Sequence, residues 1–100
     1  MKSVVKAVQV ERFNDLKEPG QYILTGHHGV EGKHGLMFRC PCGCGALGHL
    51  PFDSYTRPSY VTETWTWDGN ETEPTLSPSI QRTSACRWHG FLKKGLFEEC

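Results

Sequence analysis

Three cysteines within five residues constrain this chain more than any other feature. They lie in Cys40-Pro41-Cys42-Gly43-Cys44-Gly45, and a second short group, Cys86-Arg87-Trp88-His89, follows about forty residues later. Because proline and glycine alternate with the thiols, the first group cannot form a regular helix and suits a tight turn whose sulfurs converge. Zn²⁺ takes four tetrahedral Cys or His ligands, commonly as two short groups from distant parts of a chain. The pattern predicts a zinc site, with the ligand set open among the cysteines and His89.

Disulfide bonds are the alternative use of these thiols. Adjacent C-x-C pairs give strained disulfides, and five cysteines would leave one thiol unpaired. Cysteines grouped at metal-ligand spacing also fit a reducing compartment, and residues 1–6 lack the apolar core of a signal peptide. We therefore expect a metal rather than disulfides, and a cytoplasmic location.

Length and charge narrow the class of protein. One hundred residues fit a single domain, residues 1–100. A chain of this size buries only about two thirds of the surface that its unfolded form exposes, so a metal that links strands would add stability. Eleven basic and eleven acidic residues give zero net charge, which leaves no positive field for the phosphates of a nucleic acid. No apolar run approaches the ~18 residues that a membrane span needs. We therefore expect neither a membrane span nor a nucleic-acid partner.

Alternation of apolar and polar residues predicts a mainly β fold with little helix, a small antiparallel sheet or hairpin module stapled by zinc. The expected strands are 4–10, 21–25, 36–39, 46–50 and 60–67, with a closing hairpin over 89–97. The cysteine turn would lie at the tip of the hairpin between the third and fourth of these strands. Trp65 and Trp67 share one strand face and are expected in the core. Pro74 and Pro78 are expected to exclude a central strand before Ile80.

A glycine-rich segment, residues 26–35, is expected to be a flexible loop. It contains His27, His28 and His34, and no fixed ligand spacing separates them. We expect these histidines to be solvated loop residues, with a second metal site or a part in chemistry as the alternative.

Three separated blocks of the sequence resemble a known family. The blocks are residues 38–45, Trp65 with Pro74-Thr75-Leu76-Ser77-Pro78-Ser79-Ile80, and Cys86-x-x-His89-Gly90-Phe91-Leu92-x-x-Gly95. Their order and spacing are similar to those of a family of small domains from phages and prophages. Relatives of that family occur in bacterial operons for ubiquitin-like conjugation, beside E1-like and E2-like proteins. The resemblance covers about residues 36–100 and implies a zinc-stapled β domain.

For the operon relatives, the resemblance implies a serine-type peptidase that processes a ubiquitin-like protein or removes it from its targets. Carried onto this chain, it nominates Ser79 as the nucleophile and His89 as the base. That assignment leaves four thiols to hold the zinc: Cys40, Cys42, Cys44 and Cys86. A zinc-bound imidazole has one nitrogen committed to the metal, so His89 does not readily act as both base and ligand. At the level of sequence, His89 stays open between these two roles.

Other roles stay open as well. Asp68, Glu71 and Glu73 are candidates for the third catalytic group, and spacing singles out none of them. Alternative bases are His27, His28, His34 and His49. A zinc with an open coordination position could activate water itself, which would make Ser79 structural. Cys100 is either a free thiol or a late ligand. The non-catalytic alternative for the whole chain is a zinc-stapled phage module that binds a host protein.

Overall fold

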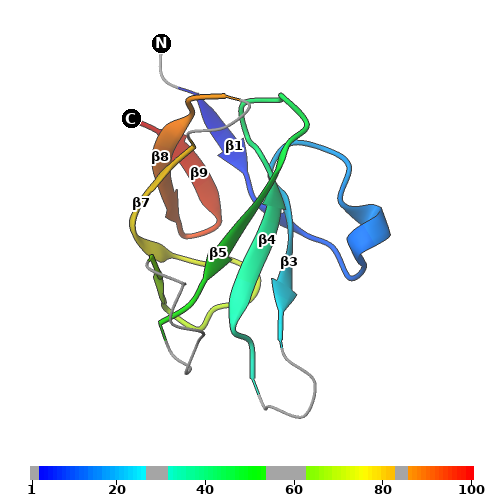
Figure 1. Cartoon of the computed structure of the whole chain (residues 1–100), viewed down its shortest axis with the longest axis vertical. Helices are drawn as coiled ribbons and strands as arrows, with labels where there is room; N and C mark the ends of the chain where they lie inside the picture. Colours follow the sequence, from blue (N-terminus) through cyan, green and yellow to red (C-terminus); the bar gives the residue numbers. More distant parts are fainter. Residues whose placement is uncertain (1–2, 27–31, 54–62, 83–85) are drawn as a thin grey trace.

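The computed structural model describes residues 3–26, 32–53, 63–82 and 86–100 of the chain. Over these residues, two β-sheets pack against each other (Figure 1), and helical structure is limited to one 3₁₀ turn, η1 (Phe13–Asp15). The mainly β fold with little helix that the sequence predicts is confirmed.

The larger sheet has five strands in the order β1-β9-β8-β7-β6. These strands are β1 (Val4–Lys6), β6 (Thr66–Trp67), β7 (Leu76–Gln81), β8 (His89–Lys93) and β9 (Leu96–Glu99). Each described neighbouring pair is antiparallel. β8 and β9 form the closing hairpin that the sequence predicts. Its turn is Lys94-Gly95, where both residues have a positive φ.

The smaller sheet has four strands in the order β2-β3-β4-β5. They are β2 (Val8–Gln9), β3 (Gln21–Thr25), β4 (Gly35–Arg39) and β5 (Leu47–Pro51). β2 is parallel to β3, whereas β3, β4 and β5 are antiparallel to their neighbours. The β4–β5 hairpin carries the cysteine turn at its tip, as expected.

The prediction of one strand over residues 4–10 is wrong, because β1 and β2 belong to different sheets. Ala7 lies at the change of sheet and is only 4% exposed. Its N–H donates a hydrogen bond of 2.8 Å to the carbonyl of Gly95 in the β8–β9 turn. A small buried side chain at this position lets the backbone pass closely from one sheet to the other.

The predicted strand over residues 60–67 is regular only at Thr66–Trp67, and residues 60–62 lie outside the described part of the chain. Trp65 instead forms a parallel bridge with Phe52. Its N–H donates to the carbonyl of Pro51 at 2.9 Å, and its own carbonyl accepts from the N–H of Asp53 at 3.0 Å. These bonds hold Trp65 at the end of β5. The two sheets are therefore joined here as well as at Ala7.

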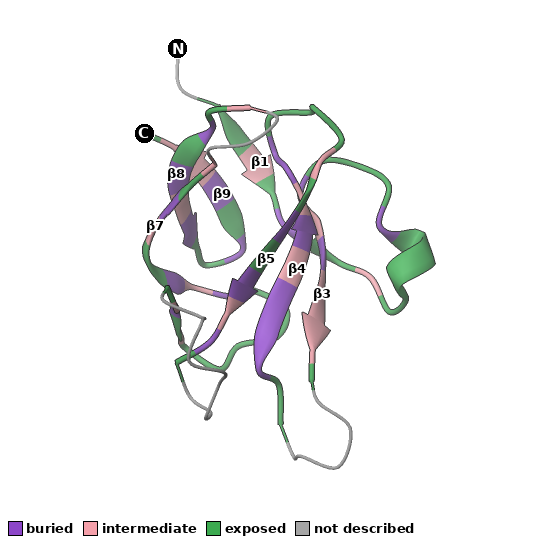
Figure 2. Cartoon of the chain, in the orientation of Figure 1, coloured by how far each residue is buried: buried purple, intermediate pink, exposed green. Residues whose placement is uncertain are grey.

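The core lies between the sheets, and Figure 2 marks in purple the buried residues that both sheets contribute. The rings of Phe38 and Phe97, one from each sheet, stack with centroids 5.5 Å apart. Phe52 stacks on Trp67 at 4.9 Å. Trp65 is buried and Trp67 packs against the same cluster, so the expectation that both indoles belong to the core is confirmed.

The expectation that proline excludes a strand before Ile80 is wrong, because β7 begins at Leu76. Leu76 pairs with Leu92, and the next described pair is Ile80 with Gly90. Between these two pairs the chain advances four residues along β7 but only two along β8. Pro78 lies inside this irregular stretch, where its missing N–H does not interrupt a regular ladder. The same irregularity sets the local direction of the chain at Ser79, one residue after Pro78.

The prediction of solvated histidines in the loop over residues 26–35 is wrong for His34. His34 is only 6% exposed, and its backbone N–H donates a hydrogen bond of 2.7 Å to the carbonyl of Thr25. The bond extends the β3–β4 pairing by one residue, which draws His34 into the sheet. His27 and His28 lie outside the described residues.

Candidate catalytic pair and metal centre

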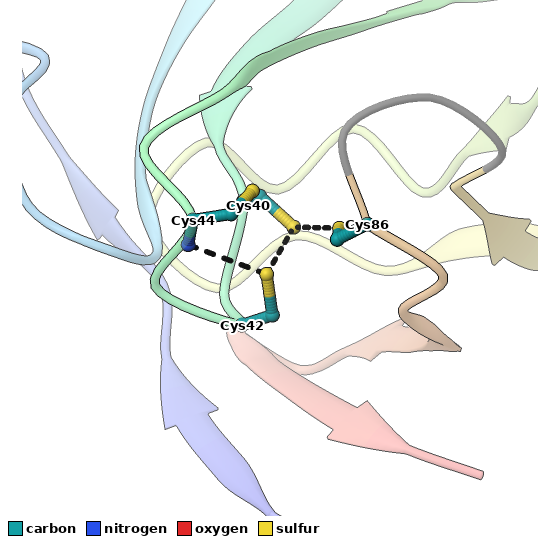
Figure 3. A group of neighbouring side chains, drawn as sticks. All are labelled: Cys40, Cys42, Cys44 and Cys86. Atoms are coloured by element: carbon teal, nitrogen blue, oxygen red, sulfur yellow. Dashed lines mark hydrogen bonds between the residues drawn. The ribbon is translucent and has the colours of Figure 1, made fainter.

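Four cysteines from two distant segments converge on one point (Figure 3). Three of them lie in the turn between β4 and β5, and Cys86 precedes β8. Their sulfur atoms all lie within 4.8 Å of one another. The Sγ of Cys40 is 3.3 Å from the Sγ atoms of both Cys42 and Cys86. Because Zn–S bonds of about 2.3 Å in a tetrahedron separate the sulfurs by about 3.8 Å, the thiols of Cys40, Cys42, Cys44 and Cys86 can hold one metal ion.

The alternation of cysteine and glycine explains the shape of this turn. Gly43 and Gly45 have φ values of 91° and 83°, which side chains rarely adopt. The N–H of Cys40 donates to the carbonyl of Ala46 at 2.9 Å, and the N–H of Gly43 donates to the carbonyl of Cys40 at 3.1 Å. These two bonds close the turn so that its thiols lie on the side facing Cys86.

Two arginines anchor the cysteine turn and the strand that follows it. Arg39 donates from Nε to the carbonyl of Leu16 at 2.9 Å and from Nη1 to the carbonyl of Gly45 at 2.8 Å. Arg82, which follows β7, donates from Nη2 to the carbonyl of Leu47 at 3.0 Å. Its guanidinium lies 5.6 Å from the centroid of the Phe38 ring. Arg82 therefore links the two sheets next to the cysteine cluster.

The pKa values of the clustered thiols are shifted in different directions. Burial raises the pKa of Cys40 and of Cys42. Burial raises the pKa of Cys86 as well, but the backbone at Trp88 and the neighbouring thiols lower it by more, to about 7. Four thiolates this close together repel one another, and a bound divalent cation offsets that repulsion.

Ser79 and His89 lie on neighbouring strands in hydrogen-bond contact, with 3.1 Å between Oγ of the serine and Nε2 of the histidine. Ser79 is half-buried on β7, and His89 is exposed at the start of β8. The structure thus brings together the two residues nominated as nucleophile and base. His89 is not a member of the cysteine cluster found among the described residues.

The contact between the two side chains is held by the register of β7 and β8. The next residues, Ile80 and Gly90, are paired across these strands. Ile80 is only 1% exposed, and a Cβ at Gly90 would lie 2.2 Å from a backbone oxygen of β9. The indole N–H of Trp65 donates to the carbonyl of Ser79 at 3.3 Å. Packing beneath the sheet therefore fixes the backbone on both sides of the pair.

A family model matches residues 9–100, and its description is bacterial ubiquitination-like system serine protease (BubE). The chain belongs to the BubE family. This match confirms the resemblance drawn from the three sequence blocks. No curated protein and no solved structure matches the chain. Along the described residues, none of the structure is a helix with the length and apolar character that crossing a membrane requires.

A serine protease of the BubE family needs a hydroxyl whose proton a base can accept. The observed pair meets that need if Nδ1 of His89 carries the ring proton and Nε2 accepts from Ser79 Oγ–H. Metal-activated water is the competing chemistry. Four thiols complete a tetrahedral set and leave no coordination position for water, so the arrangement favours the serine.

The candidates for a third catalytic group do not contact His89 among the described residues. Oδ1 of Asp68 instead accepts hydrogen bonds from the backbone N–H groups of Asn70 and Thr75, at 3.0 and 3.2 Å. The carbonyl of Glu71 accepts a hydrogen bond from the Tyr22 hydroxyl. Glu73 lies in the same turn, where its N–H donates to the Asn70 side chain at 2.9 Å. These contacts hold the turn between β6 and β7.

The alternative bases lie elsewhere or outside the described residues. His34 and His49 belong to the four-stranded sheet, and Nε2 of His49 lies 3.4 Å from Thr25 Oγ1. Cys100 is exposed and outside the cysteine cluster, and its N–H donates to the His89 carbonyl at 2.8 Å. Of the histidines that the structure describes, His89 is the one in contact with Ser79.

Proposed function

We propose that this chain is a zinc-containing serine protease that hydrolyses the amide bond at the C-terminus of a ubiquitin-like protein. Ser79 is the nucleophile and His89 is the general base. The observation that carries the proposal is the 3.1 Å contact between Ser79 Oγ and His89 Nε2. Membership of the BubE family supports both the reaction type and the substrate class.

The reaction follows from the pair. Ser79 Oγ attacks the substrate carbonyl carbon while His89 Nε2 takes the hydroxyl proton. The tetrahedral intermediate then collapses, the carbon–nitrogen bond breaks, and His89 returns the proton to the leaving amine. Water attacks the resulting ester with His89 again accepting the proton, which releases the carboxylate and restores the Ser79 hydroxyl.

The exposed position of the pair fits a protein substrate. His89 is exposed on the sheet and Ser79 is half-buried, so an extended peptide can reach both. The conjugated C-terminal tail of a ubiquitin-like protein is such a peptide. This position therefore favours a flexible protein tail over a small molecule that needs an enclosing cavity.

We propose Zn²⁺ as the ion of the cysteine cluster, held by Cys40, Cys42, Cys44 and Cys86. Bound there, zinc supplies a structural cross-link between the two sheets. The chemistry at the substrate belongs to Ser79 and His89.

The test uses a ubiquitin-like protein from a bacterial ubiquitination-like operon, fused through its C-terminus to a reporter peptide. Wild-type protein is expected to release the reporter, and Ser79→Ala is expected to abolish release. Ser77→Ala is the matched control, because Ser77 is an exposed serine on the same strand, and it should retain activity. Equal release by Ser79→Ala and Ser77→Ala would overturn the proposal.

A further inference from the structure

The outer face of the five-stranded sheet carries more than the candidate catalytic pair. Along β8, burial alternates, so that His89, Phe91 and Lys93 face outward while Gly90 and Leu92 face the core. Leu92 and Phe97, on the inner face of β8 and β9, are 0% exposed. The inner face is therefore filled, and a substrate can approach Ser79 only across the outer face.

A cavity opens on this sheet beyond the pair. It has a volume of about 380 Å³ and is lined by Thr75, Lys93, Lys94, Leu96 and Glu98. Leu96 is a large apolar residue with 37% of its surface exposed, and it lies opposite Lys93 in the β8–β9 register. The methylene chains of the two lysines add further apolar surface. The volume accommodates one large apolar side chain with the backbone beside it.

The cavity lies at a defined distance from the pair. Lys93 is four residues from His89 on β8 and points to the same side. At about 3.3 Å per residue, four residues of strand span about 13 Å. Phe91 lies between them, and the Lys93 ammonium sits 4.5 Å from the centroid of its ring. An extended peptide that starts at Ser79 and crosses Phe91 reaches the cavity about four residues from the scissile bond.

The rim of the cavity carries an excess of positive charge. Lys93 and Lys94 contribute two ammonium groups against the single carboxylate of Glu98. The N–H of Lys94 donates to Thr75 Oγ1 at 2.9 Å, which fixes the backbone of the turn at the rim. A lysine or arginine side chain is disfavoured here, whereas an apolar side chain fits the walls.

We propose that this cavity is the specificity pocket for the tail of the ubiquitin-like substrate. It binds an apolar side chain about four residues before the scissile bond and rejects a basic one. Leu96 forms the apolar wall, and Lys93 and Lys94 disfavour positive charge. The inference rests on the proposed function, because the catalytic pair sets the point from which the residues are counted.

The first arm of the test measures hydrolysis of N-acetyl tetrapeptide coumarin amides. Leucine is moved through each position of a tetra-alanine peptide, with lysine as the basic comparison. Leucine in the fourth position before the coumarin should raise kcat/KM about tenfold over alanine, and lysine there should not. Leu96→Glu should bring the ratio of the leucine to the alanine rate close to one. Val8→Glu, at an exposed apolar strand residue of the other sheet, should keep the ratio. Equal rates for leucine and alanine in the wild type would overturn the pocket.

The second arm measures binding without hydrolysis. Ser79→Ala protein is titrated with N-acetyl-Leu-Ala-Ala-Ala amide and with the tetra-alanine amide, and backbone amide signals are followed by NMR. The leucine peptide is expected to bind about tenfold more tightly and to shift the amides of Thr75, Lys93 and Leu96. Equal binding of both peptides, or shifts confined to other residues, overturns the pocket. Leucine-selective binding to Ser79→Ala, together with no hydrolysis of any coumarin amide by the wild type, supports the pocket and counts against the proposed protease.

Discussion

The two sheets contribute differently to the candidate metal centre and the candidate catalytic pair. The four-stranded sheet presents three thiols at the tip of one hairpin, and the segment entering the five-stranded sheet supplies Cys86. The metal centre is thus shared between the sheets. Ser79 and His89 both belong to the five-stranded sheet, where strand register brings them together. We therefore expect loss of a bound metal to act on the whole fold, and loss of either side chain of the proposed catalytic pair to act on chemistry alone.

Metal removal should give the largest effect. A structural zinc in a small domain contributes on the order of 10 kcal/mol, which is comparable to the whole free energy of unfolding. Chelation or Cys40→Ser should therefore lower Tm by roughly 20 °C or more, or unfold the protein. Calorimetry with metal analysis measures this effect.

Cys100→Ser is the matched control for the cysteine substitution, because Cys100 is exposed and outside the cluster. It should leave Tm and the metal content unchanged. An unaltered Tm after verified removal of the metal would contradict the idea that the ion joins the sheets.

Substitution of His89 should distinguish the role of the candidate catalytic pair from that of the candidate metal centre. His89→Ala is expected to lower kcat/KM by about 10²- to 10⁴-fold, as loss of a general base does. Its Tm and metal content should match the wild type, because His89 is not in the cysteine cluster. His49→Ala, at an exposed histidine of the other sheet, should keep its activity. A loss of bound metal in His89→Ala would assign this residue to the metal instead.

Substitution of Arg82 tests a contact between the two sheets that does not involve the cysteine cluster. Arg82→Ala removes the hydrogen bond to the Leu47 carbonyl and the cation–π contact with Phe38. The expected cost is about 1–3 kcal/mol in urea unfolding, with the metal still bound. Arg82→Lys should recover only part of this, since an ammonium lacks the planar fork of a guanidinium. Stability equal to that of the wild type in Arg82→Ala would mean that the metal and the core suffice to hold the sheets together.

Tyr22 should give the smallest effect. It is 0% exposed, and Tyr22→Phe loses the hydrogen bond to the Glu71 carbonyl, at a cost of about 1 kcal/mol. Burial and then the charge of Glu71 raise the pKa of Tyr22 from its ordinary value of 10.0 to about 12. The folded state therefore holds this proton more tightly than the unfolded state, and the resulting stability is lost as pH rises from 10 to 12. Urea unfolding across this range should show a steeper decline for the wild type than for Tyr22→Phe, and parallel curves would contradict the assignment.

Local patterns in the sequence predicted the elements whose partners are close along the chain. The cysteine-tipped hairpin and the β8–β9 hairpin are of this kind. The division of residues 4–10 was missed because β1 pairs with β9 at the far end of the chain and β2 with β3. The entry of Pro78 into a strand depends on an irregular pairing with β8, and no local pattern signals that pairing.

Some parts of the candidate site could be predicted from the sequence, and others could not. Cysteine number and spacing indicated the metal, and the family resemblance nominated Ser79 and His89. The cavity could not be predicted, because Thr75, Lys93 and Leu96 meet only through the register of three strands and a turn. A third catalytic group had no sequence signal, and of the three candidates the Asp68 carboxylate holds the β6–β7 turn.

The most direct test of the account is to map where a fluorophosphonate reacts. Metal-loaded wild-type protein is treated at neutral pH, and the adduct is located by peptide mass spectrometry. The account predicts one adduct, on Ser79, and its loss in His89→Ala protein that keeps its metal and its Tm. An adduct on another residue, no adduct at all, or labelling of Ser79 that persists without His89 would contradict it.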